Sequence, residues 1–515
     1  MKAPRLSYAV ADVLTYRRGG QQVQAHPRPM TMPSTTTLLF WICASTSCSS
    51  ELERAPETPT SVSRQSETDE AQEEQQDDRE PAAEEASEQT IPRSIESFPP
   101  APKVPTGPLA PDLAAAIDVT FGQSLHDGSW GDEQIDALEV IATSGDPRSA
   151  WIVSDLLRIS TDPQLRALLA LTAFVVLDLD ADLSNAWGTV TDHLIAWDIP
   201  APPNYLGYKR NVFTLVVPEW ERIFQPGAID WRHVTWGGVR IDKRPFDQTD
   251  ELCNCIPAAD NPPVTGADEA DWLDDDDVVF GVAVGEEYRA YPRQIMEVRE
   301  MVNDTLGGRH IGMPYCTLCG SAQAYFTDRL PEGVERPVLR TSGLLIRSNK
   351  VMFDLNTYSV FDTFLGTAVT GPLADKGIVL PQAGVVTTTW GEWKRAHPTT
   401  TVLVEDLALG RDFDFRNGRD AHGPIFPIGD MDPRLAVHDD VVGIVTDSGT
   451  PIAFPVVRAT EALKQGKSIA FENVRLRLDA GGLRAVGEHG EDLGGHQAFW
   501  FAWSQFHPGT LVWSE

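Results

Sequence analysis

The chain has 515 residues, of which 75 are acidic and 42 are basic, so its formal net charge is −33. This length predicts about two to four domains. The charge excludes a general polyanion binder, because a nucleic-acid surface needs clustered Lys and Arg, and we expect no nucleic-acid partner. No apolar run approaches the roughly 18 residues that span a bilayer, which excludes a polytopic membrane protein.

The first 50 residues resemble an export signal. The apolar run Leu38–Ala44 follows several arginines and precedes small residues up to Cys48, which is the order found in secretory signals. The end of this segment resembles a bacterial lipoprotein box, although Ser45 stands where Leu is usual. An unstructured N-terminus with a chance apolar patch is the alternative. We expect export to the periplasm or outer cell surface, with a lipid on Cys48 as the membrane contact.

Residues 51–108 are predicted to be an acidic, disordered tether. Residues 51–97 alone carry 15 Asp and Glu against 4 Arg, with few aromatic or β-branched side chains. Such a segment cannot bury enough apolar area to offset its ordering entropy.

Residues 109–230 are predicted to form a small helical domain. Apolar residues recur there at helical spacing, for example Ile135, Leu138 and Ile141. Asp146-Pro147 and Asp162-Pro163 each fit an N-cap followed by a proline in the first turn. Short helices punctuated in this way resemble HEAT-type hairpins, and an ordinary helical bundle fits the pattern equally well.

Residues 231–410 are predicted to be mainly β, and residues 411–515 a degenerate second copy. The segment from Trp390 to Val402 matches the segment from Trp500 to Val512 at six positions without a gap. Upstream, the strand patterns that begin at Val278 and Val441 correspond as well. The second copy is shorter by 53 residues, and it lacks a counterpart of the cysteine motif.

Each repeat contains two Trp spaced by three and a His four residues further on. This spacing places the rings on one helical face, where they could stack on a ligand or pack on a sheet. We favour packing, because the pattern recurs in the copy without the cysteines.

The candidate site for chemistry is the Cys316-Thr-Leu-Cys319 motif, which Gly320 follows. Two thiols at this spacing can form a disulfide or share a metal ion. Because Gly adopts the left-handed conformation easily, we expect a tight turn between two strands. Cys253 and Cys255 would complete a four-cysteine metal site if the fold brought them close. Redox-active thiols, a metal site and a structural disulfide remain the three alternatives.

Residues 251–410 resemble the bacterial domain-of-unknown-function family 3179. The similarity rests on ordered short motifs, which are Ile256–Pro262, Ala290–Pro292, Val302–Asp304, Tyr315–Gly320, Ser342-Gly343, Met352–Asp354, Thr357–Ser359 and Trp390. Some members of that family carry selenocysteine in the cysteine motif. The resemblance therefore implies redox chemistry rather than zinc binding.

This chain departs from the family pattern at two places. Arg299-Glu300 stands where the family often has His-Glu, and Thr317 replaces a proline within the cysteine motif. Glu300 could act as an acid or base, although we expect a surface ion pair with Arg299. Asp354 could line the cleft beside the thiols or form a turn.

The sequence thus predicts an α+β fold, in which a small helical domain precedes a mainly β domain with a degenerate internal duplication. The predicted function is an extracytoplasmic thiol redox protein, and a thiol oxidoreductase is the enzyme class that would fit. Cys316 is expected to be the accessible, more reactive thiol. The catalytic candidates of this predicted redox protein are Cys316, Cys319, Glu300 and Asp354. No cofactor is required, and the partner is a redox protein or a small molecule. The alternative is a metal- or ligand-binding surface module with zinc, iron or copper on Cys253, Cys255, Cys316 and Cys319.

Overall fold

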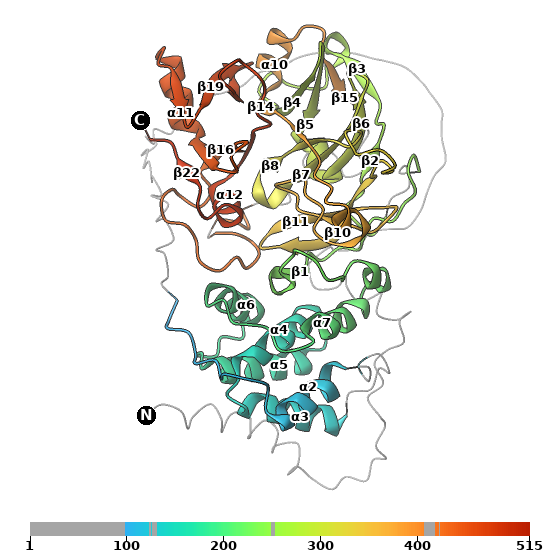
Figure 1. Ribbon diagram of the computed structural model, residues 1–515, viewed down its shortest axis with the longest axis vertical. Helices are drawn as coiled ribbons and strands as arrows, with labels where there is room; N and C mark the ends of the chain where they lie inside the picture. The colour runs from blue at the N-terminus through green and yellow to red at the C-terminus, as the bar shows by residue number, and fades with distance from the viewer. Residues whose placement is uncertain are drawn as a thin grey trace, which may run out of the picture. The chain divides into compact units, whose positions relative to one another are not determined.

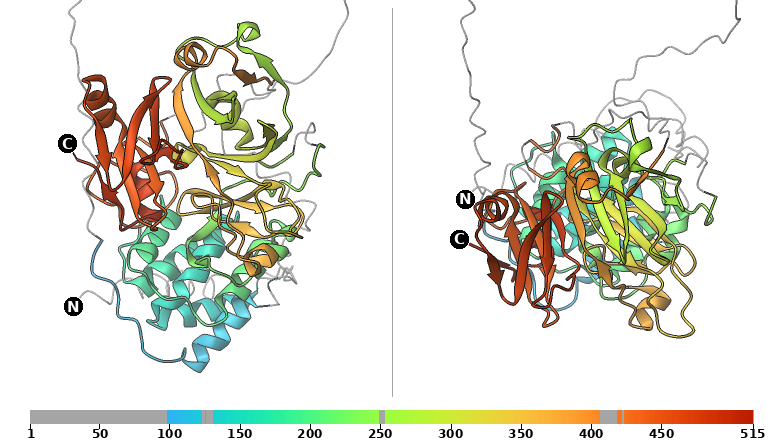
Figure 2. Two further views of the ribbon diagram at one scale, coloured as in Figure 1. Left: turned by 45° about the horizontal axis from the view of Figure 1, so that its top comes forward. Right: turned by 90° about the horizontal axis from the view of Figure 1, so that it is seen from above.

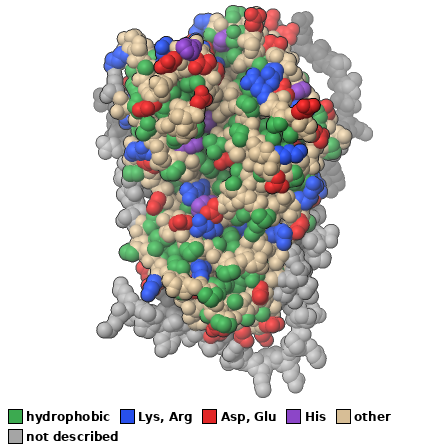
Figure 3. Space-filling model, viewed as in Figure 1, with side chains coloured by type: hydrophobic (Ala, Val, Ile, Leu, Met, Phe, Trp, Pro, Cys, Tyr) green, Lys and Arg blue, Asp and Glu red, His purple; other side chains and the backbone are tan. Residues whose placement is uncertain are grey.

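The computed structural model describes residues 98–122, 125, 131–248, 253–405, 418–421 and 423–514. The predicted export segment, the lipidation residue Cys48 and nearly all of the acidic tether lie outside the described residues. Within the described residues, no helix is both long enough and apolar enough to cross a membrane. On the face seen in Figure 3, acidic and basic side chains are interspersed.

The first part of the described chain is helical, as predicted (Figure 1). Its α-helices are α2 (Pro111–Phe121), α3 (Asp132–Thr143), α4 (Ala150–Ile159), α5 (Pro163–Leu177), α6 (Ala186–Ala196) and α7 (Tyr205–Thr214). The Asp162 carboxylate accepts the Leu165 backbone N–H and Pro163 opens α5, which is the predicted cap. Asp146 and Pro147 likewise open a short 3₁₀ turn before α4.

The helices share a hydrophobic core with the first sheet. The buried Trp220 indole donates a hydrogen bond to the Ser342 carbonyl at 2.8 Å. The Arg158 guanidinium donates to the Trp236 carbonyl at 2.9 Å. The helical part therefore packs directly against the β part through buried contacts.

Five small sheets follow the helices. Sheet 1 contains β1 (Val234–Trp236), β10 (Leu339–Ile346), β11 (Asn349–Asp354) and β12 (Val360–Phe361). Sheet 2 contains β13 (Gln382–Ala383), β9 (Ala324–Phe326), β7 (Arg309–Cys316), β6 (Met301–Leu306), β2 (Ala259–Asp260) and β8 (Ser321–Ala322). Sheet 3 contains β14 (Val385–Thr389), β4 (Val278–Val284), β5 (Glu287–Pro292), β15 (Thr401–Leu403) and β3 (Val264–Gly266).

The last two sheets come from the C-terminal part of the chain. Sheet 4 contains β21 (His496–Phe499), β16 (Asp440–Val445), β17 (Pro451–Pro455) and β22 (Leu511–Val512). Sheet 5 contains β18 (Ile469–Phe471), β19 (Val474–Asp479) and β20 (Gly482–Val486). Short helices connect the strands, and these are α8 (Arg293–Arg299), α9 (Gly371–Asp375), α10 (Trp390–Ala396), α11 (Val456–Lys464) and α12 (Trp500–Phe506).

The predicted α+β class is wrong, because the five sheets form a propeller-like ring (Figure 2). Neighbouring sheets touch through β10 and β6, β5 and β6, β14 and β20, and β16 and β20. Sheets 4 and 1 are joined by a hydrogen bond. The Gln505 side chain, in the helix α12 that follows β21 of sheet 4, donates to the carbonyl of Arg347, which follows β10 of sheet 1. Left-handed residues such as Ser348 and Asn473 form the tight turns between β10 and β11 and between β18 and β19. The HEAT-type repeat is not confirmed.

The predicted duplication is compatible with this arrangement. Sheet 3 contains the order β14-β4-β5-β15, and sheet 4 has the order β21-β16-β17-β22. In both sheets the first two pairings are antiparallel and the third is parallel. A short helix, α10 or α12, follows the equivalent strand in each.

The Trp residues of the repeats pack against the sheets, as expected. A Cβ atom at Gly281 would lie 2.2 Å from the Trp393 ring, and one at Gly443 would lie 2.3 Å from the Trp503 ring. Each indole N–H donates to a threonine hydroxyl at 2.9 Å, in one copy to Thr400 and in the other to Thr510. Glycine is therefore needed at both positions, because a tryptophan ring lies directly against the backbone of the strand there.

Within the part of the chain that the structure describes, four Asp-x-Arg pairs form the same local clamp in the connecting segments. In each, one aspartate oxygen accepts the backbone N–H and Nε–H of the arginine, and the other accepts from Nη2. The pairs are Asp146 and Arg148, Asp230 and Arg232, Asp242 and Arg244, and Asp432 and Arg434. Each arginine also donates to a carbonyl that is more distant in the sequence, and these are Gly107, Ile199, Ala258 and Thr510.

Candidate functional site: a buried pair of thiols

The Cys316–Cys319 segment forms the tight turn that the sequence predicts. Strand β7 ends at Cys316, one 3₁₀ turn covers Thr317–Cys319, and Gly320 adopts a φ of 59°. Strand β8 then runs back along β7, so that Cys316 pairs with Ser321. The left-handed Gly reverses the chain and holds both cysteines on the inner side of the sheet.

Both cysteines are free thiols, and both are buried, with exposed fractions of 2% and 0%. The Cys316 and Cys319 Sγ atoms lie 3.8 and 3.5 Å from the Ser348 carbonyl oxygen. Burial raises the pKa of the Cys319 thiol well above its usual range, and the hydrogen bond with Cys316 and the charge of Glu300 raise it further. Cys319 therefore keeps its proton at neutral pH.

The expectation that Cys316 is accessible is wrong. Both thiols belong to a hydrophobic cluster that includes Phe499 and Trp503 of the second copy. A Cβ atom at Gly320 would lie 2.9 Å from the Phe499 ring, so this ring lies directly on the turn. The C-terminal sheet therefore covers the cysteine motif, which no local sequence pattern reveals.

Glu300 lies beside the thiols rather than on the surface. It follows α8 with a φ of 46°, and its side chain accepts a hydrogen bond from the Thr317 hydroxyl at 2.9 Å. Its carboxylate forms an ion pair with Lys350 at 3.4 Å. The expected pairing with Arg299 is wrong, because Arg299 pairs with Glu405. Thr317, where the family often has proline, thus supplies a bond that proline could not make.

Lys350 is the site residue that the sequence did not reveal. It belongs to β11 and its side chain is buried. The ammonium donates to the backbone carbonyls of Glu300 and Tyr315, the latter at 3.2 Å. Burial lowers the pKa of Lys350, while the charges of Glu300 and Cys316 act in the opposite direction. The bond to the Tyr315 carbonyl places the ammonium at the residue that precedes Cys316.

Asp354 is not brought to the thiols. Its carboxylate accepts the Val338 and Thr357 backbone N–H groups, each at 2.9 Å, and the Thr357 hydroxyl at 2.7 Å. The Thr357 hydroxyl in turn contacts Ser359 at 2.8 Å. These hydrogen bonds stabilise the loop after β11. Asp354 therefore has a structural role in a turn, which is one of the two roles expected from the sequence.

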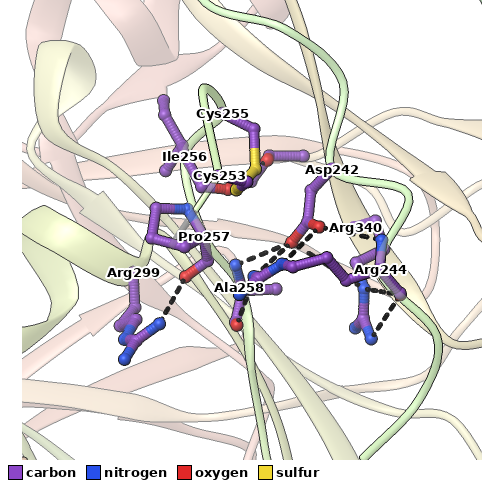
Figure 4. The surroundings of a disulfide bond; sticks show 10 residues. Asp242, Arg244, Cys253, Cys255, Ile256, Pro257, Ala258, Arg299 and Arg340 are labelled. Atoms are coloured by element: carbon purple, nitrogen blue, oxygen red, sulfur yellow. Dashed lines mark hydrogen bonds and ion pairs between the residues drawn. A yellow bond between two sulfur atoms is a disulfide. The ribbon is translucent and has the colours of Figure 1, made fainter. Parts of the chain in front are cut away.

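Cys253 and Cys255 form a disulfide with a Cα–Cα distance of 5.1 Å (Figure 4). With Asp242 they form a group whose ligand atoms lie within 4.8 Å of one another and could hold a metal ion. The two sulfurs are bonded to each other, and Asp242 is occupied by Arg244 and the Ala258 N–H. Metal binding there would require reduction of the disulfide and displacement of these donors.

The described residues contain no metal-ligand cluster that combines this pair with Cys316 and Cys319. The four-cysteine metal site is therefore not assembled in this structure. The disulfide lies instead beside Asp242, which pairs with Arg340 and Arg244 in the neighbourhood drawn in Figure 4.

Other family-like motif residues form buried polar networks. Arg340 pairs with Asp260 at 2.5 Å, both side chains fully buried, and the Asn303 amide donates to Asp260 at 2.8 Å. Tyr291 and Arg289 both donate to the Asp304 carboxylate, at 2.7 and 2.6 Å. These residues tie β2, β5, β6 and β10 together, so their motifs have a structural explanation.

The structure thus defines a ring of small sheets with a buried dithiol beside a lysine–glutamate pair. Residues 253–489 match the family described as "Protein of unknown function (DUF3179)". This part of the chain belongs to that family, as its motifs indicated. No curated protein and no solved structure was found to match the chain.

Proposed function

We propose that the DUF3179 region is a thiol-based redox module whose centre is Cys316 and Cys319. The observation that carries this proposal is two free, buried thiols that both lie against the Ser348 carbonyl, with the buried Lys350 ammonium bonded to the carbonyl of the preceding Tyr315. The pair can pass between dithiol and disulfide, releasing two electrons and two protons to an acceptor. Cys316 would react first, because Cys319 retains its proton and can then resolve the intermediate.

Export and lipid attachment at Cys48 remain part of the proposal. The Cys253–Cys255 disulfide supports an oxidising compartment, since such bonds persist mainly outside the cytosol. Replacing Cys48 with Ala should move the protein from the membrane fraction to the soluble fraction. Unchanged fractionation would contradict lipid anchoring and leave the redox proposal untouched.

The redox proposal is tested by titrating the full-length protein in thiol–disulfide buffers of graded potential. Remaining thiols are alkylated and identified by mass spectrometry. We expect a reversible Cys316–Cys319 disulfide, and we expect Cys316→Ser and Cys319→Ser each to abolish it. If both cysteines remain reduced thiols at every potential, the pair is structural and the proposal fails.

A metal-binding module is the second candidate, and the Asp242, Cys253 and Cys255 group favours it. Zinc, iron or copper are the metals that cysteine ligands suit. Metal analysis should be made on reduced protein, with Asp242→Asn as the comparison. If the reduced protein binds one equivalent of metal and the Asp242→Asn variant does not, this second function is supported. If only the Cys316→Ser variant loses the metal, the metal is bound at the dithiol instead.

A further inference from the structure

Several buried polar side chains near the thiols have no hydrogen-bond partner within the described part of the chain. They are the Ser321 hydroxyl, the Ser348 hydroxyl and both polar atoms of the Asn349 amide. Each of the three residues is at most 1% exposed. Leaving such a group unpaired costs about 1–3 kcal/mol, so native proteins rarely tolerate several together. Their concentration at one place points to a bound polar species.

These side chains belong to the segments that hold the dithiol. Ser321 is the cross-strand partner of Cys316, so the two side chains project from the same face of the β7–β8 pair. Ser348 offers its carbonyl to both sulfurs while its own hydroxyl stays unpaired. Asn349 follows Ser348 at the start of β11. The Ser321 side chain and the Ser348 carbonyl therefore border the sulfur atoms.

Burial limits what can react with Cys316. At 2% and 0% exposure, the two sulfurs are closed to a folded protein partner and to bulky reagents. A neutral molecule of a few atoms can enter without losing the hydration of a full charge. It must also accept two electrons and offer oxygen atoms to the unpaired donors.

Resting on the proposed redox function, we propose that this centre is a closed site for a small hydroperoxide. Hydrogen peroxide or a short alkyl hydroperoxide binds to the Ser321 and Ser348 hydroxyls and is reduced by Cys316 and Cys319. The two adjacent oxygen atoms of a hydroperoxide both accept hydrogen bonds and one donates, which suits a pair of hydroxyl groups.

The reaction balances with groups already present. The Cys316 sulfur attacks one peroxide oxygen, the O–O bond breaks, and the departing alkoxide takes the Cys316 proton. The Cys319 sulfur then attacks the sulfenic acid on Cys316, the S–O bond breaks, and the released hydroxide leaves as water with the Cys319 proton. One hydroperoxide and two thiols give one disulfide, one alcohol and one water.

The test is a single turnover of the reduced full-length protein with hydrogen peroxide at neutral pH. The product is read by peptide mass spectrometry as a Cys316–Cys319 linkage that has lost two hydrogens. We expect Ser321→Ala and Ser348→Ala each to slow the reaction about tenfold, the equivalent of one hydrogen bond. Ser154→Ala is the matched control, because it removes a buried serine hydroxyl from the helical part. It should react like the unmodified protein.

A second measurement needs no variant. Cumene hydroperoxide should react about tenfold or more slowly than hydrogen peroxide, because a closed site selects by size. Equal rates, or normal rates in both serine variants, would mean that the polar groups hold only water, and the peroxide site would be refuted.

The failure of this inference can be told apart from the failure of the redox function. If equilibration in the thiol–disulfide buffers forms the disulfide and peroxide does not, the peroxide site is refuted and the redox module stands. If neither treatment links Cys316 and Cys319, both proposals are refuted.

Discussion

Replacing Gly320 with Ala tests whether the C-terminal copy presses directly on the cysteine turn. Gly320 has a φ of 59°, and a left-handed non-glycine residue costs roughly 1–2 kcal/mol. The new Cβ would also lie 2.9 Å from the Phe499 ring, and overpacking of this kind costs about 1–3 kcal/mol. We therefore expect Gly320→Ala to lower the free energy of unfolding by roughly 2–5 kcal/mol.

Two further variants separate the backbone contribution from the steric one. Gly333 has a φ of 79° with nothing within 4 Å of an added Cβ, so Gly333→Ala should cost only the backbone part. Phe499→Leu should recover roughly 1–3 kcal/mol in the Gly320→Ala background, after its own cost is subtracted in a double-mutant cycle. Urea unfolding is measured for the unmodified protein and for the four variants, including the double variant. Equal losses at Gly320 and Gly333, or purely additive effects with Phe499, would refute the contact.

Three other predictions concern stability. Trp503→Ala should cost about 3–5 kcal/mol in urea unfolding, because the ring is 1% exposed, and a loss below about 1 kcal/mol would contradict its packing role. Asp260→Asn should cost roughly 3–5 kcal/mol, because it removes the nearer of the two carboxylates that pair with the buried Arg340, the other being Asp242 at 3.9 Å; an unchanged melting temperature would argue against the Asp260 pair. Burial lowers the pKa of His496 from 6.5 to about 3. Between these two pH values the unfolded chain binds a proton on His496 and the folded chain does not. Stability should therefore fall as pH decreases from 6.5, by up to about 1.4 kcal/mol per pH unit, and His496→Asn should flatten this dependence.

The turn at Cys316–Cys319 could be predicted because its determinants are local. A Gly after the second cysteine favours chain reversal, and the following apolar residues favour a strand. The caps at Asp146 and Asp162 were predictable for the same reason. The short strands could also be anticipated, but not their grouping into five sheets, because a period of two identifies a strand and not its partner.

The surroundings of the thiols could not be predicted, because they depend on contacts between distant segments. Lys350 comes from β11, and it reaches the site only because sheets 1 and 2 pack together. The Phe499 ring comes from the second copy. The sequence placed Glu300 beside Arg299, whereas the left-handed end of α8 turns its carboxylate inward. Burial of Cys316 follows from these contacts, so a motif typical of accessible thiols gave the wrong exposure.

The Asp-x-Arg clamps bear on the order in which the chain can fold. Each ion pair joins residues two positions apart, so it closes almost no loop and can form in the unfolded chain at little entropic expense. The sheets, in contrast, join strands as distant as β1 and β10, a pairing that must wait for a slow search. Each arginine that is already oriented by its aspartate needs only one remote carbonyl, such as Gly107 for Arg148 and Thr510 for Arg434. The backbone of each connecting segment is therefore already restricted before the strands pair. This restriction reduces the number of incorrect strand pairings that a chain with many short strands can form.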